Sequence, residues 1–285
     1  MATSGIRYNR PQELNGGLMR ITILGTGNAV VTKCYNTCFV LSEGGRNLLV
    51  DAGGGSGIIT QLSQAGISPA ELPEIFVTHR HIDHILGIMW MLRMQSYAVA
   101  AGQLEGVTIY AHDEAISIIR EMAQMLLTRE LSFFGDRLRL VSVSDGETRS
   151  VMGLSCTFFD IQSTKAKQFG FSIVTTEGLR LTCCGDEPLS ENGVSYARHA
   201  DWLMHEAFCL EAEADHFKPY EKHHSTVASA CRRAEELGVR NLVLYHTEDT
   251  HYAERQRLYL AEGRPLFSGN LYVPYDLDVI ELGEA

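Results

Sequence analysis

The chain has 285 residues and a formal net charge of −11, from 24 Lys and Arg against 35 Asp and Glu. This negative balance repels polyphosphate backbones, so it disfavours nucleic acid as a partner. No apolar run approaches the roughly 20 residues that span a bilayer, and the polar lead of residues 1–18 lacks the apolar core of a secretion signal, which together predict a cytoplasmic protein.

The first half of the chain alternates apolar runs with turn residues. Runs rich in β-branched and apolar residues predict strands, and a run with helical spacing that ends on glycine predicts a helix. The expected strands are residues 21–27, 37–43, 46–51 and 73–84, and the expected helices are residues 56–66 and 85–101. The third strand ends on Asp51 before a glycine-rich turn, and the fourth ends at a group of histidines.

The second half is richer in strands. Further strands are expected at residues 106–112, 137–147, 154–162, 170–178, 179–187, 200–208 and 239–246, and helices at 114–127 and 223–238. The last helix has Ser225 or its neighbour as N-cap and Gly238 as its end. We find no internal repeat and no proline-rich linker, so the length favours one domain over residues 1–285.

The segment THRHIDH, residues 78–84, holds three histidines and one aspartate within seven residues. Histidine is the commonest protein ligand for zinc-like ions, and crevices at the C-terminal ends of strands are where open α/β folds place their sites. Three further segments deliver potential ligands just after apolar runs: Asp186, the pair His205 and Glu206, and His246. We therefore predict a metal site at this sheet edge, with the first cluster in a loop and His205 packed below the site.

The order of short motifs resembles the metallo-β-lactamase superfamily, in particular its ribonuclease Z-like and phosphodiesterase branch. The matching segments cover nearly the whole chain and are GTG (25–27), LLVDAGGG, THRHIDH, GFSI, CGDE, HEAF, HHST and LYHTEDT. The resemblance implies an α/β fold, an αββα four-layer sandwich, that binds one or two divalent ions: zinc, or else manganese or iron. The implied ligands are His79 and His81 for the first ion, Asp83, His84 and His246 for the second, and Asp186 as a bridge.

The resemblance also implies the chemistry. A bridging hydroxide with a lowered pKa can attack phosphorus or a carbonyl while the ions neutralise the developing charge. His224, held by Glu206, would protonate the leaving oxygen, and with Asp83 these form the expected catalytic group. The alternative is that His223, His224 and Glu206 make a helix cap and a surface ion pair. Asp51 either orients a histidine or is a turn residue.

One ligand of the family pattern is missing. The family's first metal takes another histidine from the loop before the GF strand, and counting back from Gly170 places it near Thr164. Water could fill the position, which should weaken binding. Alternatively, Lys165 or Lys167 enters the pocket to replace the first metal's charge or to bind a substrate phosphate. Both lysines could equally be solvated loop residues.

The leading hypothesis is a metal-dependent phosphodiesterase that acts on a small phosphodiester, such as a nucleotide derivative or cyclic nucleotide. Ribonuclease Z-like processing of tRNA is disfavoured by the net charge of −11 and because no basic, glycine- and proline-rich insertion occurs between Val107 and Asp186. Two more hypotheses compete with these: a non-catalytic descendant that binds a nucleotide or partner, and an enzyme that hydrolyses a carboxyl ester or lactam. Family members are often dimers, so a homodimer is possible.

Overall fold

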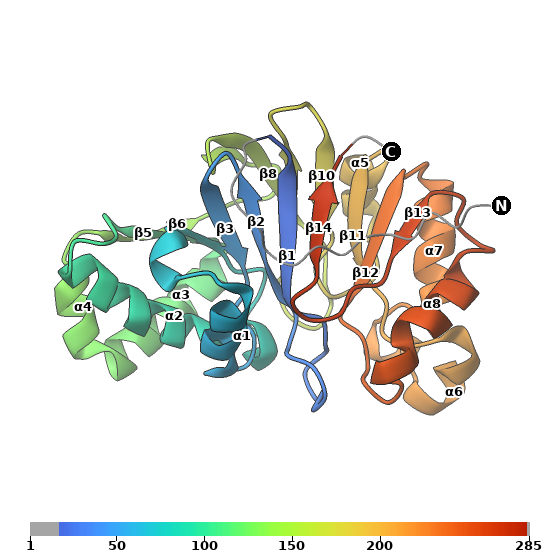
Figure 1. Ribbon diagram of the computed structural model, residues 1–285, viewed down its shortest axis with the longest axis horizontal. Coiled ribbons are helices and arrows are strands. Elements are labelled where there is room, and N and C mark those ends of the chain that lie inside the picture. Colours follow the sequence, from blue (N-terminus) through green and yellow to red (C-terminus); the bar gives the residue numbers. More distant parts are fainter. Residues whose placement is uncertain (1–16, 284–285) are drawn as a thin grey trace.

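Two β-sheets lie face to face with helices on both outer sides (Figure 1). The computed structural model describes residues 17–283, so almost all of the polar lead of residues 1–18 lies outside the described residues. The four layers confirm the expected αββα sandwich. Within residues 17–283, no helix is long and apolar enough to cross a membrane.

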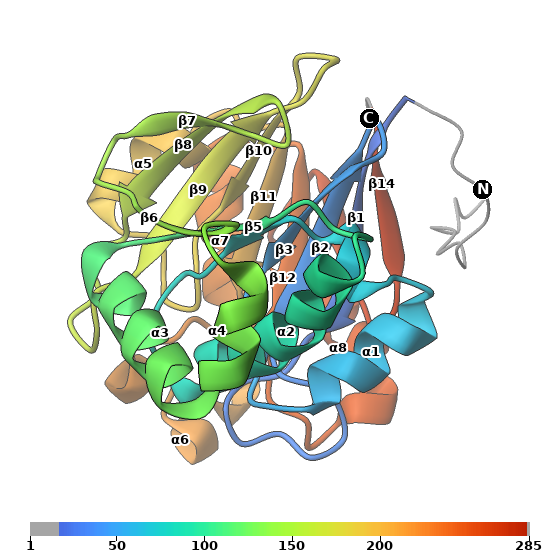
Figure 2. The ribbon, with the colours of Figure 1, turned by 90° about the vertical axis from the view of Figure 1, so that its left-hand side faces the viewer.

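The first sheet comes from the N-terminal half plus the last strand. Its order is β14 (Val279–Leu282), β1 (Met19–Gly25), β2 (Cys38–Glu43), β3 (Arg46–Val50), β4 (Glu74–Phe76), β5 (Val107–Ala111) and β6 (Leu138–Ser142). Strands β14 to β3 pair antiparallel, whereas β3 to β6 pair parallel. Its outer helices, in front in Figure 2, are α1 (Gly57–Ala65), α2 (Ile82–Ala100), α3 (Asp113–Leu126) and α4 (Thr128–Phe134).

The second sheet mirrors this plan. Its order is β13 (Asn270–Tyr272), β12 (Asn241–Tyr245), β11 (Trp202–Glu206), β10 (Arg180–Cys183), β9 (Phe169–Val174), β8 (Leu154–Asp160) and β7 (Thr148–Val151). Strands β10 to β13 are parallel and β7 to β10 antiparallel. The helices on this side are α5 (Glu191–Ala197), α6 (Ala214–Phe217), α7 (Val227–Glu236) and α8 (Arg255–Gly263).

Alternation along the strands builds three apolar layers. In β2, Phe39 and Leu41 face the space between the sheets, whereas Cys38 and Val40 face the helices. Successive side chains of a strand point to opposite faces, so a strand covered on both faces reads as an apolar run rather than an alternating one. This explains why the apolar runs of the sequence predicted the strands. All seven cysteines are free thiols, and six of them are buried.

The boundaries differ from the prediction around the histidines. The expected strand over 73–84 ends at Phe76, and His81 is the N-cap of α2. Asp83 and His84 therefore lie in the first helical turn rather than in a loop. A carboxylate in the first turn stabilises a helix because it faces the exposed N–H groups there. Thr226, the neighbour of Ser225, caps α7 with its side chain.

Candidate metal centre

The predicted ligands gather where parallel strands of both sheets end. The relevant positions are Asp51 after β3, His79 and His81 after β4, Asp83 and His84 in α2, Asp186 after β10, Glu206 at the end of β11, and His246 after β12. The C-terminal ends of parallel strands share one edge of a sheet. Because the two sheets are packed face to face, their edges bring both sets of side chains together.

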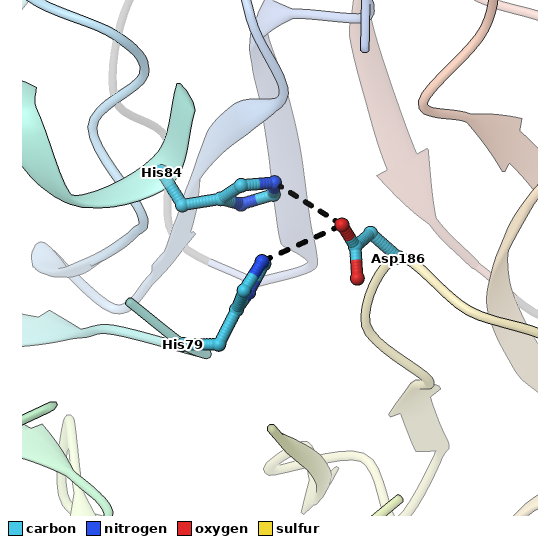
Figure 3. Close-up of side chains that lie close together, drawn as sticks. All are labelled: His79, His84 and Asp186. Atoms are coloured by element: carbon cyan, nitrogen blue, oxygen red, sulfur yellow. Dashed lines mark ion pairs between the residues drawn. The ribbon is translucent and has the colours of Figure 1, made fainter. Parts of the chain in front are cut away.

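One oxygen of Asp186 is the centre of the group. Its Oδ2 lies 3.5 Å from His79 Nε2, 3.6 Å from His84 Nε2 and 3.6 Å from His246 Nε2. Figure 3 shows His79, which follows β4, and His84, which lies in α2, converging on this oxygen from the same side. Two ligand atoms that share an ion at about 2 Å each lie roughly 3–4 Å apart. The spacing therefore suits a shared cation.

Two groups of ligand atoms lie on either side of Asp186. On one side, His79 Nε2 lies 2.8 Å from His81 Nδ1. On the other, Asp83 Oδ2 lies 3.4 Å from His84 Nε2 and 3.7 Å from His246 Nε2. The structure thus brings together the expected ligands of both ions.

Two of the clustered imidazoles, those of His84 and His246, have ring nitrogens without a hydrogen-bond partner among the described residues. These buried atoms are His84 Nε2 and both ring nitrogens of His246. A buried polar atom without a partner is costly and calls for an explanation such as an ion. Imidazole nitrogen and carboxylate oxygen are the donors that zinc and similar ions take. The residues present fit a divalent metal.

The charges of the cluster agree with this fit. Burial disfavours ionised Asp186, yet the imidazoles of His79 and His246 hold its pKa well below its usual range. Asp83 behaves likewise: burial opposes the charge, and His84 lowers the pKa. Burial lowers the pKa of His79, whereas at His84 the carboxylates of Asp51 and Asp83 outweigh burial and raise the pKa. Both carboxylates of the centre are therefore charged among imidazoles.

Asp51 lies behind the histidines. Its Oδ2 accepts hydrogen bonds from His84 Nδ1 at 2.7 Å and from the Thr78 hydroxyl at 2.7 Å, and its Oδ1 accepts one from the Thr78 N–H at 2.8 Å. The Thr78 Oγ1 in turn lies 2.9 Å from His79 Nδ1. Protons on the two Nδ1 atoms leave the Nε2 lone pairs free for a metal. This is the arrangement expected of an orienting residue.

His224 and Glu206 form a buried pair beside this centre. Glu206 Oε2 lies 3.6 Å from His224 Nδ1, and Oε1 accepts a hydrogen bond from the Ser225 N–H. The His224 ring stacks on Phe208, with centroids 5.0 Å apart and an interplanar angle of 14°. Glu206 is fully buried and His224 is 8% exposed, so the alternative of a surface ion pair is wrong. His205 packs below, with Nδ1 2.7 Å from the Glu206 carbonyl oxygen.

The position of the missing histidine holds no ligand. Thr164 is exposed. The loop instead sends Gln168 into the centre, where its Nε2 donates to Asp186 Oδ1 and lies 2.8 Å from His79 Nδ1. Sequence reasoning missed this residue because it searched for another histidine. The available signal was a polar residue directly before the GF strand.

The two lysines of this loop are engaged in ion pairs. Lys167 pairs with Asp113 at 2.6 Å, beside the N-terminus of α3. Lys165 lies 3.3 Å from Glu187 Oε1 and donates to the Lys222 carbonyl oxygen at 3.1 Å. A role of either lysine in substrate binding stays a prediction.

Comparisons with known proteins agree with this geometry. Ribonuclease Z of Thermococcus sibiricus is 25% identical over 316 aligned residues, which cover 94% of this chain and 97% of the relative. The metallo-β-lactamase fold protein YhfI from Bacillus subtilis superimposes with a TM-score of 0.75 at 19% identity, covering 93% of this chain and all of that one. A diphosphatase from the PhnP family gives a TM-score of 0.72 at 17% identity, covering 94% of this chain and 99% of that chain.

These similarities confirm the expected metallo-β-lactamase fold. A narrower match comes from the profile of the family described as anti-Pycsar protein Apyc1, which covers residues 19–259. That span takes in every predicted metal ligand and the pair of His224 and Glu206. The chain therefore belongs to the anti-Pycsar protein Apyc1 family.

Proposed function

We propose that this protein is a phosphodiesterase that cleaves a small phosphodiester, such as a nucleotide derivative or a cyclic nucleotide, with one or two divalent ions. The observation that carries this proposal is the buried pair of His224 and Glu206, whose imidazole lies 5.3 Å, centroid to centroid, from that of His246. A metal centre alone suits many hydrolyses. A histidine beside the metal centre, held by a buried carboxylate, suits a reaction in which a poor leaving group must be protonated as it departs.

His79, His81 and Asp186 would hold the first ion, and Asp83, His84, His246 and Asp186 the second. Zinc is the first candidate because its usual ligands are nitrogen and carboxylate oxygen. When bound, the ions would activate water at neutral pH and neutralise charge that develops on the phosphate. Asp51 would keep the rings of His79 and His84 in the tautomer that binds.

His224 would act as the general acid. Because its Nδ1 faces Glu206, the proton for transfer sits on Nε2. As the bond between phosphorus and the leaving oxygen breaks, this proton moves to that oxygen, and the leaving group departs as a neutral alcohol. The stacked Phe208 ring and the Glu206 carboxylate hold the imidazole plane during the transfer.

RNA processing is the second candidate, favoured by the similarity to ribonuclease Z over 94% of the chain. The net charge of −11 weighs against a long RNA substrate. Binding of a nucleotide or partner without catalysis is less well supported, since the centre keeps two carboxylates and four imidazoles within ligand distance despite the missing histidine.

The test compares two leaving groups in the His224→Ala variant. We expect the metal-loaded protein to hydrolyse small phosphodiesters, and His224→Ala to lower kcat by about 10²–10⁴-fold on a cyclic nucleotide. The loss should be much smaller on bis(p-nitrophenyl) phosphate, because p-nitrophenolate leaves without a proton. Initial rates on both substrates, with metal content measured in parallel, give the comparison.

His223→Asn is the matched control, since His223 is the exposed neighbour with φ +54°, a conformation that asparagine tolerates. It should keep the activity of the unaltered chain. Equal losses on both substrates would contradict the general-acid role. A folded, metal-loaded protein that is inert towards cyclic nucleotides, activated diesters and RNA alike would contradict the phosphodiesterase itself.

A further inference from the structure

The side chain of Gln168 reaches the centre from the loop in which the family pattern places a histidine. We infer that Gln168 compensates for that missing ligand without binding the metal: its amide N–H fixes Asp186 from behind, so that three protein ligands would hold the first ion. The inference rests on the metal assignment of the proposed function. It assigns Gln168 as a positioning residue for the first ion.

The backbone of Gln168 is fixed to the strand end that carries His79. The Phe169 N–H donates to the Thr78 carbonyl oxygen at 3.0 Å, and the Ile161 N–H donates to the Gln168 carbonyl oxygen at 3.0 Å. His79 and Gln168 form an antiparallel bridge outside the named strands. Gln168 is 1% exposed. The amide therefore enters the centre from an anchored backbone position.

The amide nitrogen contacts the rear atoms of two ligands. The two oxygens of Asp186 have different neighbours: Oδ2 faces the imidazole nitrogens, whereas Oδ1 accepts a hydrogen bond from Gln168 Nε2. The two ring nitrogens of His79 also have different neighbours: Nε2 faces the centre, and Nδ1 lies 2.8 Å from Gln168 Nε2. Because His79 Nδ1 carries a proton that can be donated to Thr78 Oγ1, Gln168 hydrogen-bonds to Asp186 and only packs against His79. A neutral donor is needed here, because a carboxylate would repel Asp186.

The space around the amide is closed by Gly185. This residue has φ +77°, and a Cβ added to it would lie 3.1 Å from Gln168 Cδ and from Oε1. The amide therefore packs on the backbone directly before Asp186. Tight packing limits rotation of the side chain, which keeps its hydrogen bond aimed at Asp186.

The two ions are consequently held unequally. The first would have three protein ligands, His79, His81 and Asp186, the number that catalytic zinc sites use. The second would have four. We expect two-step loading in which the second ion binds more tightly, and in which Gln168 acts mainly on the weaker step.

The experiment titrates the metal-free full-length chain with Zn²⁺ alone and follows it by calorimetry and by elemental analysis after dialysis. We expect two equivalents of unequal affinity. In Gln168→Leu, which keeps the bulk but loses the donor, the weaker equivalent should lose about 10–100-fold in affinity. The more tightly bound equivalent of Zn²⁺ should remain, which would show that the variant is folded. Gln64→Leu, on the exposed face of α1, is the matched control and should titrate like the unaltered chain.

Gln168→Glu separates positioning from direct ligation. A carboxylate is the better ligand, so a tighter first site in this variant would overturn the inference; a weaker one supports it, because glutamate cannot donate to Asp186. The inference also fails if Gln168→Leu keeps both affinities, or if the unaltered chain binds one equivalent only. The titration needs no substrate. A protein inert towards phosphodiesters that still loads in two steps, the weaker of which depends on Gln168, would therefore overturn the proposed function alone.

Discussion

Asp186→Asn is expected to lose most of its bound metal and to lower kcat/KM on a small phosphodiester by about a thousandfold. The amide keeps the shape of the side chain but removes the charge from the oxygen that lies 3.5–3.6 Å from three imidazole nitrogens. Charge stabilisation by such ions is worth several kcal/mol in the transition state, and about 1.4 kcal/mol corresponds to a tenfold change in rate. Elemental analysis and steady-state rates on one preparation give both quantities.

Asp215→Asn is the control for this change, because the Asp215 carboxylate is fully exposed in α6. It should retain metal and activity. If Asp186→Asn kept both as well, Asp186 could not be the residue shared by two ions, and the assignment of the centre would have to be abandoned.

Arg255→Met is expected to lower the free energy of unfolding by about 2–4 kcal/mol, because three buried acceptors lose a charged donor and hydrogen bonds to charged groups contribute about 1.5–3 kcal/mol each. Arg255 is 1% exposed. Its guanidinium donates to Thr247 Oγ1 at 2.6 Å, Thr26 Oγ1 at 3.0 Å and the Pro274 carbonyl oxygen at 2.7 Å. Methionine fills part of the volume but leaves these acceptors without a donor. Urea unfolding should show a lower midpoint at unchanged slope.

The same helix supplies the control. Arg257 is exposed and pairs only at the surface with Glu254, so Arg257→Met should change stability by no more than about 0.5 kcal/mol. Thr247 directly follows His246, so Arg255→Met should also weaken the binding of the second ion. Equal stabilities of the two variants would show that the buried network contributes little.

The strands and the metal cluster could be predicted from the sequence because each depends on a local pattern. Apolar runs such as LLV in β3 identify a strand covered on both faces, and the ligands follow directly after such runs. The family resemblance then supplied the pairing of distant segments. It also supplied His224 and Glu206, which lie 18 positions apart and share no local spacing rule.

The elements that were not predicted depend on distant partners. Strand β14 has four residues and is formed by pairing with β1, Met19 opposite Leu282. Helix α8 has little apolar periodicity, and its buried residues are Arg255, Tyr259 and Gly263. Arginine rarely lies inside a protein. Gln168 was missed for a related reason. A glutamine that supports ligands by hydrogen bonding has no signature spacing, and its role appears only once His79 and Asp186 are adjacent.

The centre takes its ligands from both halves of the sandwich. Residues 79–84 lie after β4 and at the start of α2, and Asp186 and His246 follow strands β10 and β12 of the second sheet. The ligands can meet only after the sheets have docked, since contacts so distant in sequence form late. A bound ion should then act as a cross-link that slows unfolding and leaves the refolding rate almost unchanged. Urea-jump kinetics with and without Zn²⁺ measure both rates. Ion-dependent refolding would mean that the centre assembles early, before the two halves of the sandwich have closed.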